Sequence, residues 1–267
     1  MRLGLGSYTF GWAVGVEGYP PGRPLDENGL LDKVRRAGLS VLQIGDNLPL
    51  HLFGMNRLQD LAGRATREGI QLEIGARRLT PERVSEYVGI ARHVGARLIR
   101  FVIDDTDYHP DPDTVTGVLR ESAALLGDLT LAIENHDRFP AATFRSMIEA
   151  TGDDRIGVCL DTANSLGAGE GISAVASVLA PLTVNLHLKD FRVQRVPHLM
   201  GFVVSGCPAG CGLMDLPRLL EELSRFGRCK TAILEQWTTP EPQIDQTIAK
   251  EDTWASQSLQ YLEPFFH

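Results

Sequence analysis

Four side chains of types that bind metal ions each stand at the end of a short apolar segment. The side chains and their segments are Glu134 in Leu129–Glu134, Asp161 in Ile156–Asp161, His187 in Thr183–His187 and Glu235 in Thr231–Glu235. The segments are rich in Ile, Leu and Val, which is typical of buried parallel strands. Functional groups gather at the carboxyl ends of such strands, so we expect these four side chains to meet. Three carboxylates and one imidazole at one place indicate a divalent cation.

The donor set favours particular ions and a particular chemistry. Carboxylate oxygens with one imidazole nitrogen suit Mn2+, Mg2+ or Co2+, with Zn2+ as an alternative that more often takes His or Cys ligands. An open coordination position would let a substrate hydroxyl and carbonyl chelate the ion, which then stabilises an enediolate. Glu134 and Glu235 are the candidate acid/base pair for moving a proton on that substrate. Cys207 and Cys211 have no second Cys/His pair of zinc-site type nearby, so we do not expect zinc there.

Strand-like and helix-like segments alternate along the whole chain. The predicted strands are Arg2–Tyr8, Val41–Gly45, Gln71–Ala76, Leu98–Ile103, Leu129–Glu134, Ile156–Asp161, Thr183–Leu188 and Thr231–Glu235. The predicted helices are Asn28–Ala37, Arg57–Glu68, Pro81–Val94, Pro112–Leu126, Ala141–Ala150, Ile172–Leu179, Leu216–Phe226 and Glu251–Leu262. Eight such units in 267 residues predict a single (β/α)8 TIM barrel of one domain, residues 1–267, rather than a doubly wound open sheet.

Composition limits the classes of partner. The 26 basic and 34 acidic residues give a net charge of −8, which disfavours nucleic acid as a general partner. No apolar segment has the length of a membrane span. The chain enters a strand-like segment almost at once, so we expect no signal peptide. Four cysteines are too few for a disulfide scaffold in a chain of this length. We therefore expect a cytoplasmic protein that acts on a small molecule.

Further residues are candidates for contact with a substrate. His136 follows Glu134 by two positions and Lys189 follows His187 by two, so each pair points to one side of its strand if the strand persists. The other candidates are Asn164, Arg192, Trp12 and Asp46, with Arg195 as a further cation and with Tyr8 and Trp237 as further aromatic wall residues. Their structural alternatives are a helix cap, a rim salt bridge, a loop brace and ordinary aromatic packing.

Two long loops follow strands on the predicted active face. They are Tyr8–Asp26, and Asp190–Asp215 with its Gly/Cys-rich stretch Ser205–Gly212. Long loops in this position commonly form lids and specificity walls. We expect the loop Asp190–Asp215 to close over the substrate.

The segments around the four ligand-type residues resemble those of a known family. The matching stretches are Ala132–His136 (AIENH), Val158–Asn164 (VCLDTAN), Asn185–Asp190 (NLHLKD) and Ile233–Trp237 (ILEQW). They resemble the xylose isomerase-like superfamily of TIM-barrel sugar isomerases and epimerases, in element order over essentially the whole chain. The resemblance implies that Glu134, Asp161, His187 and Glu235 hold one metal ion, and that the two glutamates also exchange the proton.

The chain departs from one pattern of this superfamily and is also similar to a second group of its enzymes. Ketose 3-epimerases of this superfamily usually have histidine three residues after the metal-binding aspartate, where this chain has Asn164. Leu5–Trp12 (LGSYTFGW) and Gln43–Leu50 (QIGDNLPL) are similar to decarboxylases of branched 3-oxo sugar acids, of the 3-oxo-isoapionate type. A carboxylate substrate would need a cation, for which Lys189, Arg192 and Arg195 are candidates.

These observations lead to one expected function and two alternatives. We expect a metal-dependent isomerase or epimerase of a small keto sugar or sugar acid, working through an enediolate. The first alternative is a metal-dependent lyase, either a 3-oxo sugar acid decarboxylase or a dehydratase. The second is a non-catalytic sugar-binding partner subunit, against which the two retained glutamates argue. A homodimer is left open as the oligomeric state.

Overall fold

A closed barrel of parallel strands forms the centre of the molecule. The computed structural model describes residues 1–266. The barrel order is β1, β10, β7, β6, β5, β4, β3, β2, and every neighbouring pair is parallel. The barrel strands are β1 (Arg2–Gly6), β2 (Val41–Ile44), β3 (Gln71–Arg77), β4 (Leu98–Val102), β5 (Thr130–Glu134), β6 (Ile156–Asp161), β7 (Thr183–Leu188) and β10 (Thr231–Leu234). The predicted (β/α)8 barrel is confirmed, and the open sheet is excluded.

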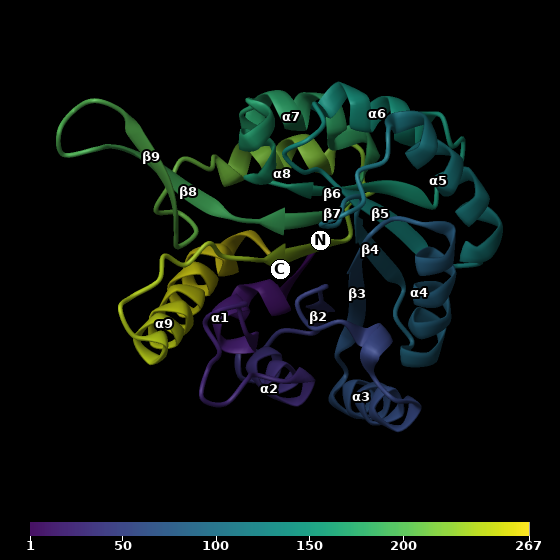
Figure 1. The fold of residues 1–267 in the computed structure, drawn as a ribbon, viewed down its shortest axis with the longest axis horizontal. Helices are drawn as coiled ribbons and strands as arrows, with labels where there is room; N and C mark the ends of the chain where they lie inside the picture. The colour runs from purple at the N-terminus through teal and green to yellow at the C-terminus, as the bar shows by residue number, and fades with distance from the viewer. Residues whose placement is uncertain (267) are drawn as a thin grey trace.

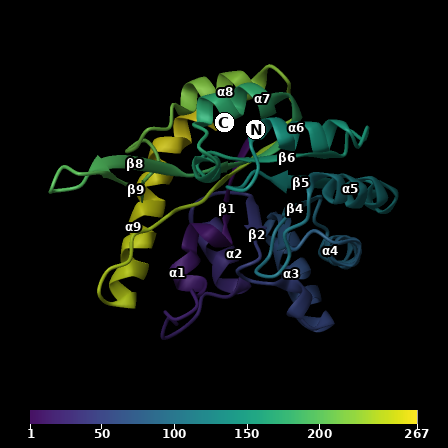
Figure 2. The same ribbon diagram turned by 45° about the horizontal axis from the view of Figure 1, so that its top comes forward.

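Helices surround the barrel on its outside, as Figures 1 and 2 show from two directions. The helices are α1 (Gly11–Val14), α2 (Glu27–Arg36), α3 (Met55–Glu68), α4 (Pro81–Val94), α5 (Pro112–Leu126), α6 (Ala141–Glu149), α7 (Ile172–Leu179), α8 (Leu216–Ser224) and α9 (Ile244–Leu262). Short 3-10 helices lie at Ser7–Phe10, Leu50–Leu52, Asn164–Ala168, Ala180–Leu182 and Glu263–Phe265. Within residues 1–266, no helix is both long and apolar enough to cross a membrane.

Local sequence signals account for the ends of several helices. Before α4, the Thr80 hydroxyl accepts a hydrogen bond from the Arg83 backbone at 3.3 Å, and Pro81 occupies the first turn. Helices α3 and α4 end at Gly69 and Gly95, whose φ angles of 68° and 71° lie in the left-handed region that favours glycine. These caps set the length of each unit, so the strands enter the barrel in register.

Alternation along the strands separates an apolar shell from a polar barrel centre. In β2 and β7, Leu42, Ile44, Leu186 and Leu188 belong to the main apolar core, which also includes residues of the surrounding helices. The residues between them point inward, and His187 lies among these at the carboxyl end of its strand. His187 is therefore held at the mouth of the barrel by a buried strand and not by a loop.

The segment after β7 is ordered differently from the predicted loop. It forms an antiparallel hairpin of β8 (Asp190–Arg195) and β9 (Phe202–Cys207), paired from Asp190 opposite Cys207 to Arg195 opposite Phe202. The hairpin extends beyond the rim of the barrel (Figure 1). The prediction of an irregular segment over Asp190–Asp215 was wrong for these two strands, because alternating Val, Phe and Arg side chains allow a ribbon without a buried face.

Candidate metal site at the mouth of the barrel

Four neighbouring strands deliver the four ligand-type residues to one place. Glu134 ends β5, Asp161 ends β6, His187 lies one position before the end of β7, and Glu235 directly follows β10. Asp161 is opposite His187 in the register of the two strands. The exposed fractions of the four residues are between 0% and 3%. The structure thus brings together, in a buried position, the set that the sequence singled out.

The imidazole of His187 faces three carboxylates. Its Nδ1 atom lies 3.7 Å from Glu134 Oε2, 3.9 Å from Asp161 Oδ2 and 3.3 Å from Glu235 Oε1. Within residues 1–266, this buried nitrogen has no hydrogen-bond partner. One donor atom each from Asp161, His187 and Glu235 lies within 4.8 Å of the others. A buried nitrogen without a partner, surrounded by carboxylate oxygens, is a donor set that fits a divalent cation.

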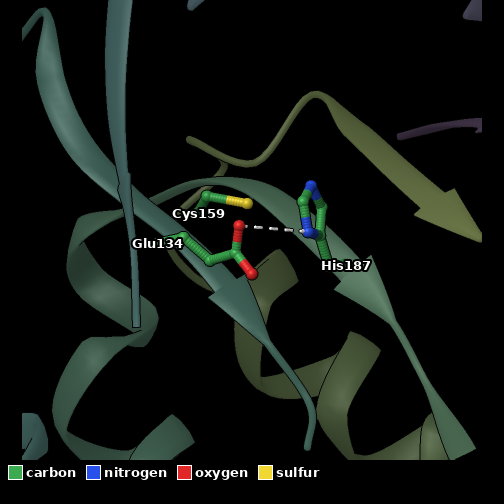
Figure 3. A group of neighbouring side chains, drawn as sticks. All are labelled: Glu134, Cys159 and His187. Atoms are coloured by element: carbon green, nitrogen blue, oxygen red, sulfur yellow. Dashed lines mark ion pairs between the residues drawn. The ribbon is translucent and has the colours of Figure 1, made fainter. Parts of the chain in front are cut away.

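Cys159 adds a sulfur atom to the inner side of this group. Figure 3 shows Glu134, Cys159 and His187 side by side, on neighbouring strands. Burial raises the pKa of the Cys159 thiol well above its ordinary value, and the nearby Glu134 raises it further. Its Sγ also donates to Asn185 Oδ1 at 3.1 Å. Because a metal ion binds the thiolate and not the thiol, the carboxylates and the imidazole are the better ligands.

A lysine ammonium group lies among the same carboxylates. Lys189 Nζ is 2.8 Å from Asp161 Oδ2 and 2.9 Å from Glu235 Oε2. Burial lowers the pKa of Lys189, but the charges of Asp161 and Glu235 outweigh it and raise that pKa well above its ordinary value. Lys189 therefore carries a positive charge at the edge of the candidate metal site.

A second cation, Arg100 of β4, is buried beside the site. Arg100 Nε lies 3.0 Å from Glu134 Oε2, and its NH1 donates to Asp46 Oδ1 at 2.7 Å. Burial raises the pKa of Glu134, but Arg100 and His187 outweigh it and hold that pKa well below the ordinary value. For His187, burial lowers the pKa, and Glu235 and Glu134 raise it above the ordinary value. The Glu134 carboxylate is thus ionised and available as a ligand.

Two polar side chains orient the ligand carboxylates. Asn164 Nδ2 donates to Glu134 Oε1 at 2.7 Å, and His136 Nε2 lies 3.6 Å from the same oxygen. The backbone N–H groups of Ala163 and Asn164 donate to Asp161 Oδ1 at 2.8 and 2.9 Å. These bonds hold one oxygen of Glu134 and one of Asp161, and the second oxygen of each lies between a buried cation and His187 Nδ1.

A cavity of about 250 Å³ opens above these residues. Its lining comprises Tyr8, Asp46, Arg77, Arg100, Val102, Glu134, His136, Asn164, Lys189, Glu235, Gln236 and Trp237. This volume suits a small molecule of sugar size. A larger cavity of about 470 Å³ lies at the opposite end of the barrel, against Met1, Arg2 and Phe266. Its lining lacks a group of ligand-type side chains, so the smaller cavity at the strand carboxyl ends is the candidate functional site.

Asp46 is the centre of a hydrogen-bonded cluster on the cavity wall. Its Oδ2 accepts from the Tyr8 hydroxyl at 2.9 Å and from Arg77 Nε at 2.8 Å, while its Oδ1 accepts from Arg100. Burial raises the pKa of Asp46, but Arg100 and Arg77 outweigh it and lower that pKa. Both oxygens of Asp46 are therefore used in holding the two arginines.

The structure separates the remaining predicted residues into two groups. His136, Asn164, Lys189 and Asp46 all line the cavity above the candidate metal site. Trp12 lines a neighbouring cavity that shares Tyr8 and Trp237 with it, and its indole donates to the Thr238 carbonyl at 2.8 Å.

Arg192 lies on the exposed hairpin strand β8, outside the lining of the site cavity. Its Nε donates to the Cys211 carbonyl at 2.7 Å, and Arg195 NH1 donates to the Leu199 carbonyl at 2.8 Å. The structure does not bring Arg192 or Arg195 to the site, because the antiparallel pairing of the hairpin carries both away from the barrel mouth.

Of the cations that line the cavity, Lys189 was predicted, whereas Arg77 and Arg100 were not. Arg100 is the one charged residue within the apolar strand Leu98–Val102, and Arg77 ends β3. A charge inside a buried strand needs a partner, so Arg100 was detectable as an anomaly. The partners Asp46 and Glu134 come from other strands, which only the folded barrel places beside it.

Comparison with known proteins gives the same architecture. The sequence profile of the xylose isomerase-like TIM barrel family matches residues 33–265. The 3-oxo-isoapionate decarboxylase of Pectobacterium atrosepticum is 30% identical over 267 residues, which cover 98% of this chain and 95% of that protein.

Two solved structures are similar at low sequence identity. D-psicose 3-epimerase from Clostridium cellulolyticum H10, in crystals with D-tagatose, gives a TM-score of 0.74 at 15% identity over 98% of this chain and 97% of that one. A xylose isomerase-like TIM barrel protein from Mycobacterium smegmatis, in complex with magnesium, gives 0.71 at 13% identity over 98% and 97%. These likenesses show the fold.

The barrel and its mouth define a class: (β/α)8 barrels in which strand carboxyl ends gather a divalent-metal donor set. Within this class, the chain belongs to the xylose isomerase-like TIM barrel family.

Proposed function

We propose that this protein is a divalent-metal-dependent decarboxylase of a small 3-oxo sugar acid. The observation that carries the proposal is the balance of charge around the cavity. Three cations, Arg77, Arg100 and Lys189, line it, and four carboxylates belong to the same group: Asp46, Glu134, Asp161 and Glu235. A divalent ion would turn the excess of one negative charge into an excess of one positive charge. A substrate with one carboxylate would neutralise the loaded cavity, whereas a neutral ketose would not.

The metal ligands in this proposal are Glu134, Asp161, His187 and Glu235. The partnerless His187 Nδ1 and the surrounding carboxylate oxygens support the assignment. A bound divalent cation would supply Lewis-acid stabilisation of negative charge on a substrate oxygen. Oxygen-rich coordination favours Mn2+, Mg2+ or Co2+ over Zn2+.

Arg77 is the residue that we assign to the substrate carboxylate. Its side chain is 44% exposed and lines the cavity, and Asp46 holds its Nε at 2.8 Å. Within residues 1–266 its other N–H groups have no hydrogen bond. They are therefore free to donate two parallel hydrogen bonds to a substrate carboxylate. Arg100 is buried between Asp46 and Glu134, forms ion pairs with both and holds the wall in place.

The reaction breaks the bond between the carboxylate carbon and the neighbouring carbon of the 3-oxo acid. The electron pair of this bond moves to the carbonyl oxygen, which gives carbon dioxide and an enediolate. A proton then returns to the carbon that lost the carboxylate. Lys189, which is charged and lines the cavity beside Glu235, is the residue that we assign to deliver this proton, and water restores it.

The relative from Pectobacterium atrosepticum supports this choice of reaction. It is named 3-oxo-isoapionate decarboxylase and is aligned over nearly the whole of both chains. Asn164, where ketose 3-epimerases usually have histidine, donates to Glu134 and leaves that carboxylate held by a neutral amide.

Isomerisation or epimerisation of a keto sugar or sugar acid is the second candidate function. The observation that favours it is the position of Glu134 and Glu235, which approach His187 Nδ1 from separate strands, at 3.7 and 3.3 Å. Two carboxylates so placed would serve as the base and the acid of a proton exchange. The depressed pKa of Glu134 makes it a weaker base, and we rank this candidate below the decarboxylase on the charge balance of the cavity and on the relative from Pectobacterium atrosepticum.

Metal analysis with an activity panel tests the proposal. Purified protein would be incubated with 3-oxo sugar acids, hydroxypyruvate and ketoses, with and without chelator, and carbon dioxide and product mass would be recorded. We expect about one divalent ion per chain, chelator-sensitive release of carbon dioxide from a 3-oxo sugar acid, and no conversion of ketoses. Conversion without loss of mass would instead assign the isomerase.

Variants of the glutamates separate an enzyme from a binding subunit. Glu235→Gln and Glu134→Gln should each lower turnover by about 10²–10⁴. A protein that binds metal and sugar acid but turns over no substrate in the panel would overturn both catalytic candidates. It would then be a sugar-binding subunit.

A further inference from the structure

A layer of buried polar side chains lies directly beneath the candidate metal site. It consists of Gln43, Glu73, Asn185, Thr231 and Cys159, which come from β2, β3, β7, β10 and β6 and are between 0% and 2% exposed. The interior of such a barrel is ordinarily filled by branched apolar residues. A polar layer at this depth must be hydrogen-bonded throughout, so the partners of each atom determine which groups donate.

The hydrogen bonds of this layer fix the orientation of the Gln43 amide. Gln43 Nε2 donates to Glu73 Oε2 and to Asn185 Oδ1, both at 3.1 Å. Exchanging the two amide atoms would place the Gln43 oxygen against these two acceptors. The observed orientation is therefore the favourable one.

The orientation of Asn185 is fixed in the same way. Its Nδ2 donates to Glu73 Oε2 at 3.2 Å and to Thr231 Oγ1 at 2.8 Å, while its Oδ1 accepts from Cys159 Sγ at 3.1 Å. Thr231 Oγ1 in turn donates to Glu73 Oε1 at 2.7 Å. Glu73 accepts from Gln43, Asn185 and Thr231, so reversing Gln43 would break its bonds to both Glu73 and Asn185.

The remaining atom of the Gln43 amide contacts the candidate metal ligand. Gln43 Oε1 lies 2.6 Å from His187 Nε2. A carbonyl oxygen only accepts, so His187 Nε2 must carry the hydrogen. In the neutral imidazole, the lone pair is then on Nδ1, the atom that faces Glu134, Asp161 and Glu235.

We propose that Gln43 is a positioning residue that fixes His187 in the tautomer with its hydrogen on Nε2. The ring then offers Nδ1 to the metal ion. Glu73 acts through Gln43, because its acceptor oxygens hold the amide in the orientation that accepts from His187. The inference rests on the metal site of the proposed function, but it concerns the way the ligand is prepared and not the reaction.

The direct test is the tautomer of His187 in the wild-type protein. Long-range ¹H–¹⁵N spectra of histidine-labelled protein, loaded with the diamagnetic ion Mg2+, distinguish a protonated Nε2 from a protonated Nδ1. We expect a protonated Nε2 and a metal-bound Nδ1 for His187, assigned by comparison with His187→Gln. A protonated Nδ1 would overturn the proposal without any variant having to fold.

A matched pair of variants tests the role of Gln43 in metal binding. Gln43→Met removes the acceptor at nearly constant volume, and Gln71→Met makes the same change at a glutamine that contacts Glu73 from the far side, at 3.5 Å. Loss of a hydrogen-bond partner of a metal ligand typically costs about 10–100-fold in affinity. We expect the Kd for Mn2+ alone, measured by calorimetry, to rise by that factor in Gln43→Met and to change less than about 3-fold in Gln71→Met.

The outcomes separate this inference from the proposed function. Equal Mn2+ affinity in the two variants would overturn the positioning role, even if the wild type releases carbon dioxide. A Gln43→Met protein that has lost affinity and contains the Nδ1-protonated imidazole would support it, even if no 3-oxo acid is a substrate. Protein that binds no metal at all would overturn both.

Discussion

Lys189 holds its ammonium group between two carboxylates of the candidate metal site. In metal-free protein this cation compensates Asp161 and Glu235, which are 1% and 3% exposed. Lys189→Met should therefore leave two buried carboxylates uncompensated. Removal of one partner of a buried ion pair costs about 3–5 kcal/mol. We expect the free energy of unfolding in chelator to fall by that amount.

A divalent ion should replace much of the lost charge compensation in that variant. Addition of Mn2+ should raise the free energy of unfolding more in Lys189→Met than in the wild type, as urea unfolding would measure. The same variant should lack turnover if Lys189 delivers the proton. Equal stabilisation of the two proteins by Mn2+ would contradict the proximity of Lys189 to the metal.

Arg77 and Arg192 make a matched pair of arginines inside and outside the cavity. A hydrogen bond to a charged group contributes about 1.5–3 kcal/mol, so Arg77→Met should lower kcat/KM for a 3-oxo acid by about 10–100-fold. Arg192→Met should leave it unchanged within about 2-fold, because exposed substitutions away from a site have small effects. Steady-state carbon dioxide release measures kcat/KM for both variants. A larger decrease of kcat/KM in Arg192→Met than in Arg77→Met would contradict the assignment of Arg77 to the substrate carboxylate.

Glu251 gives the fold a pH dependence away from the metal site. Its carboxylate accepts from the backbone of Trp12 and Ala13 at 3.0 and 3.1 Å, and burial raises its pKa to about 7. A carboxyl whose pKa is higher in the folded state binds its proton more tightly there. Its stabilisation is complete below the unfolded pKa and is lost as the pH rises to about 7.

The variant Glu251→Gln should remove this dependence. Between pH 4.5 and 7, the wild type should lose about 3 kcal/mol relative to the variant, from 1.36 kcal/mol per pKa unit. Urea unfolding of both proteins at pH 5 and pH 8 measures the difference. Parallel pH profiles for the two proteins would contradict the raised pKa.

The ligand-type residues could be predicted from the sequence because each stands at the carboxyl end of its own strand or directly after it. Strand ends of a parallel barrel converge whatever the side chains are, so Glu134 and Asp161 needed only an apolar segment before them. The contacts of Arg77 depend on Asp46, which comes from the loop after another strand. Such pairings are set by the tilt and register of the closed barrel, which no local pattern contains.

At the scale of elements, the hairpin β8–β9 has a buried base and an exposed outer part. Asp190 at the base accepts from the backbone of Gly210, Gly212 and Met214 at distances of 2.9 to 3.1 Å. A Cβ on Gly206 would lie 2.1 Å from the Trp237 carbonyl oxygen, so glycine is required where the hairpin passes this cavity-wall residue. The base is therefore tied to the mouth of the barrel.

Two truncations should separate the base from the outer part. Phe191 in β8 is 5% exposed and Val203 in β9 is 52% exposed. Phe191→Ala should lower the free energy of unfolding by about 3–5 kcal/mol, and Val203→Ala by less than about 0.5 kcal/mol. Urea unfolding measures both. Similar losses in the two variants would show that the outer part is covered in solution.

The exposure of the hairpin side chains explains why the sequence did not predict β8 and β9. Val193, Phe202, Val203 and Val204 are between 44% and 61% exposed, so the ribbon does not have one buried and one exposed face. Prediction of a strand from sequence depends on that alternation. The glycines and charges of this segment indicated a loop, although the two strands pair along their whole length.

At the scale of the whole molecule, metal binding should be coupled to the stability of the barrel. The four proposed ligands come from four strands, so an ion that binds them binds only the folded chain. Free Mn2+ at 100 times its Kd should raise the free energy of unfolding by about 2.7 kcal/mol. Thermal unfolding with Mn2+ or chelator should differ by about 5–10 °C. An unchanged Tm would contradict binding of Mn2+ by the four proposed ligands.

The closed barrel itself was the most predictable feature. Eight apolar segments that alternate with amphipathic ones are compatible with few fold topologies. N-cap residues such as Thr80 mark where helices begin. Helix α9 begins at Ile244, although the pattern indicated a start only at Glu251. Its first turns carry polar residues whose helical state depends on the neighbouring chain.

The hairpin leaves the barrel and returns to it at one point, since Asp190 pairs with Cys207. Its length can therefore change by whole residue pairs without moving His187 on one side or the start of α8 on the other. Insertions, deletions or exchange of this segment would alter the surface beside the cavity and spare the strands that carry the ligands. Variation in the length of this rim is thus uncoupled from the position of the four ligand-type side chains beneath it.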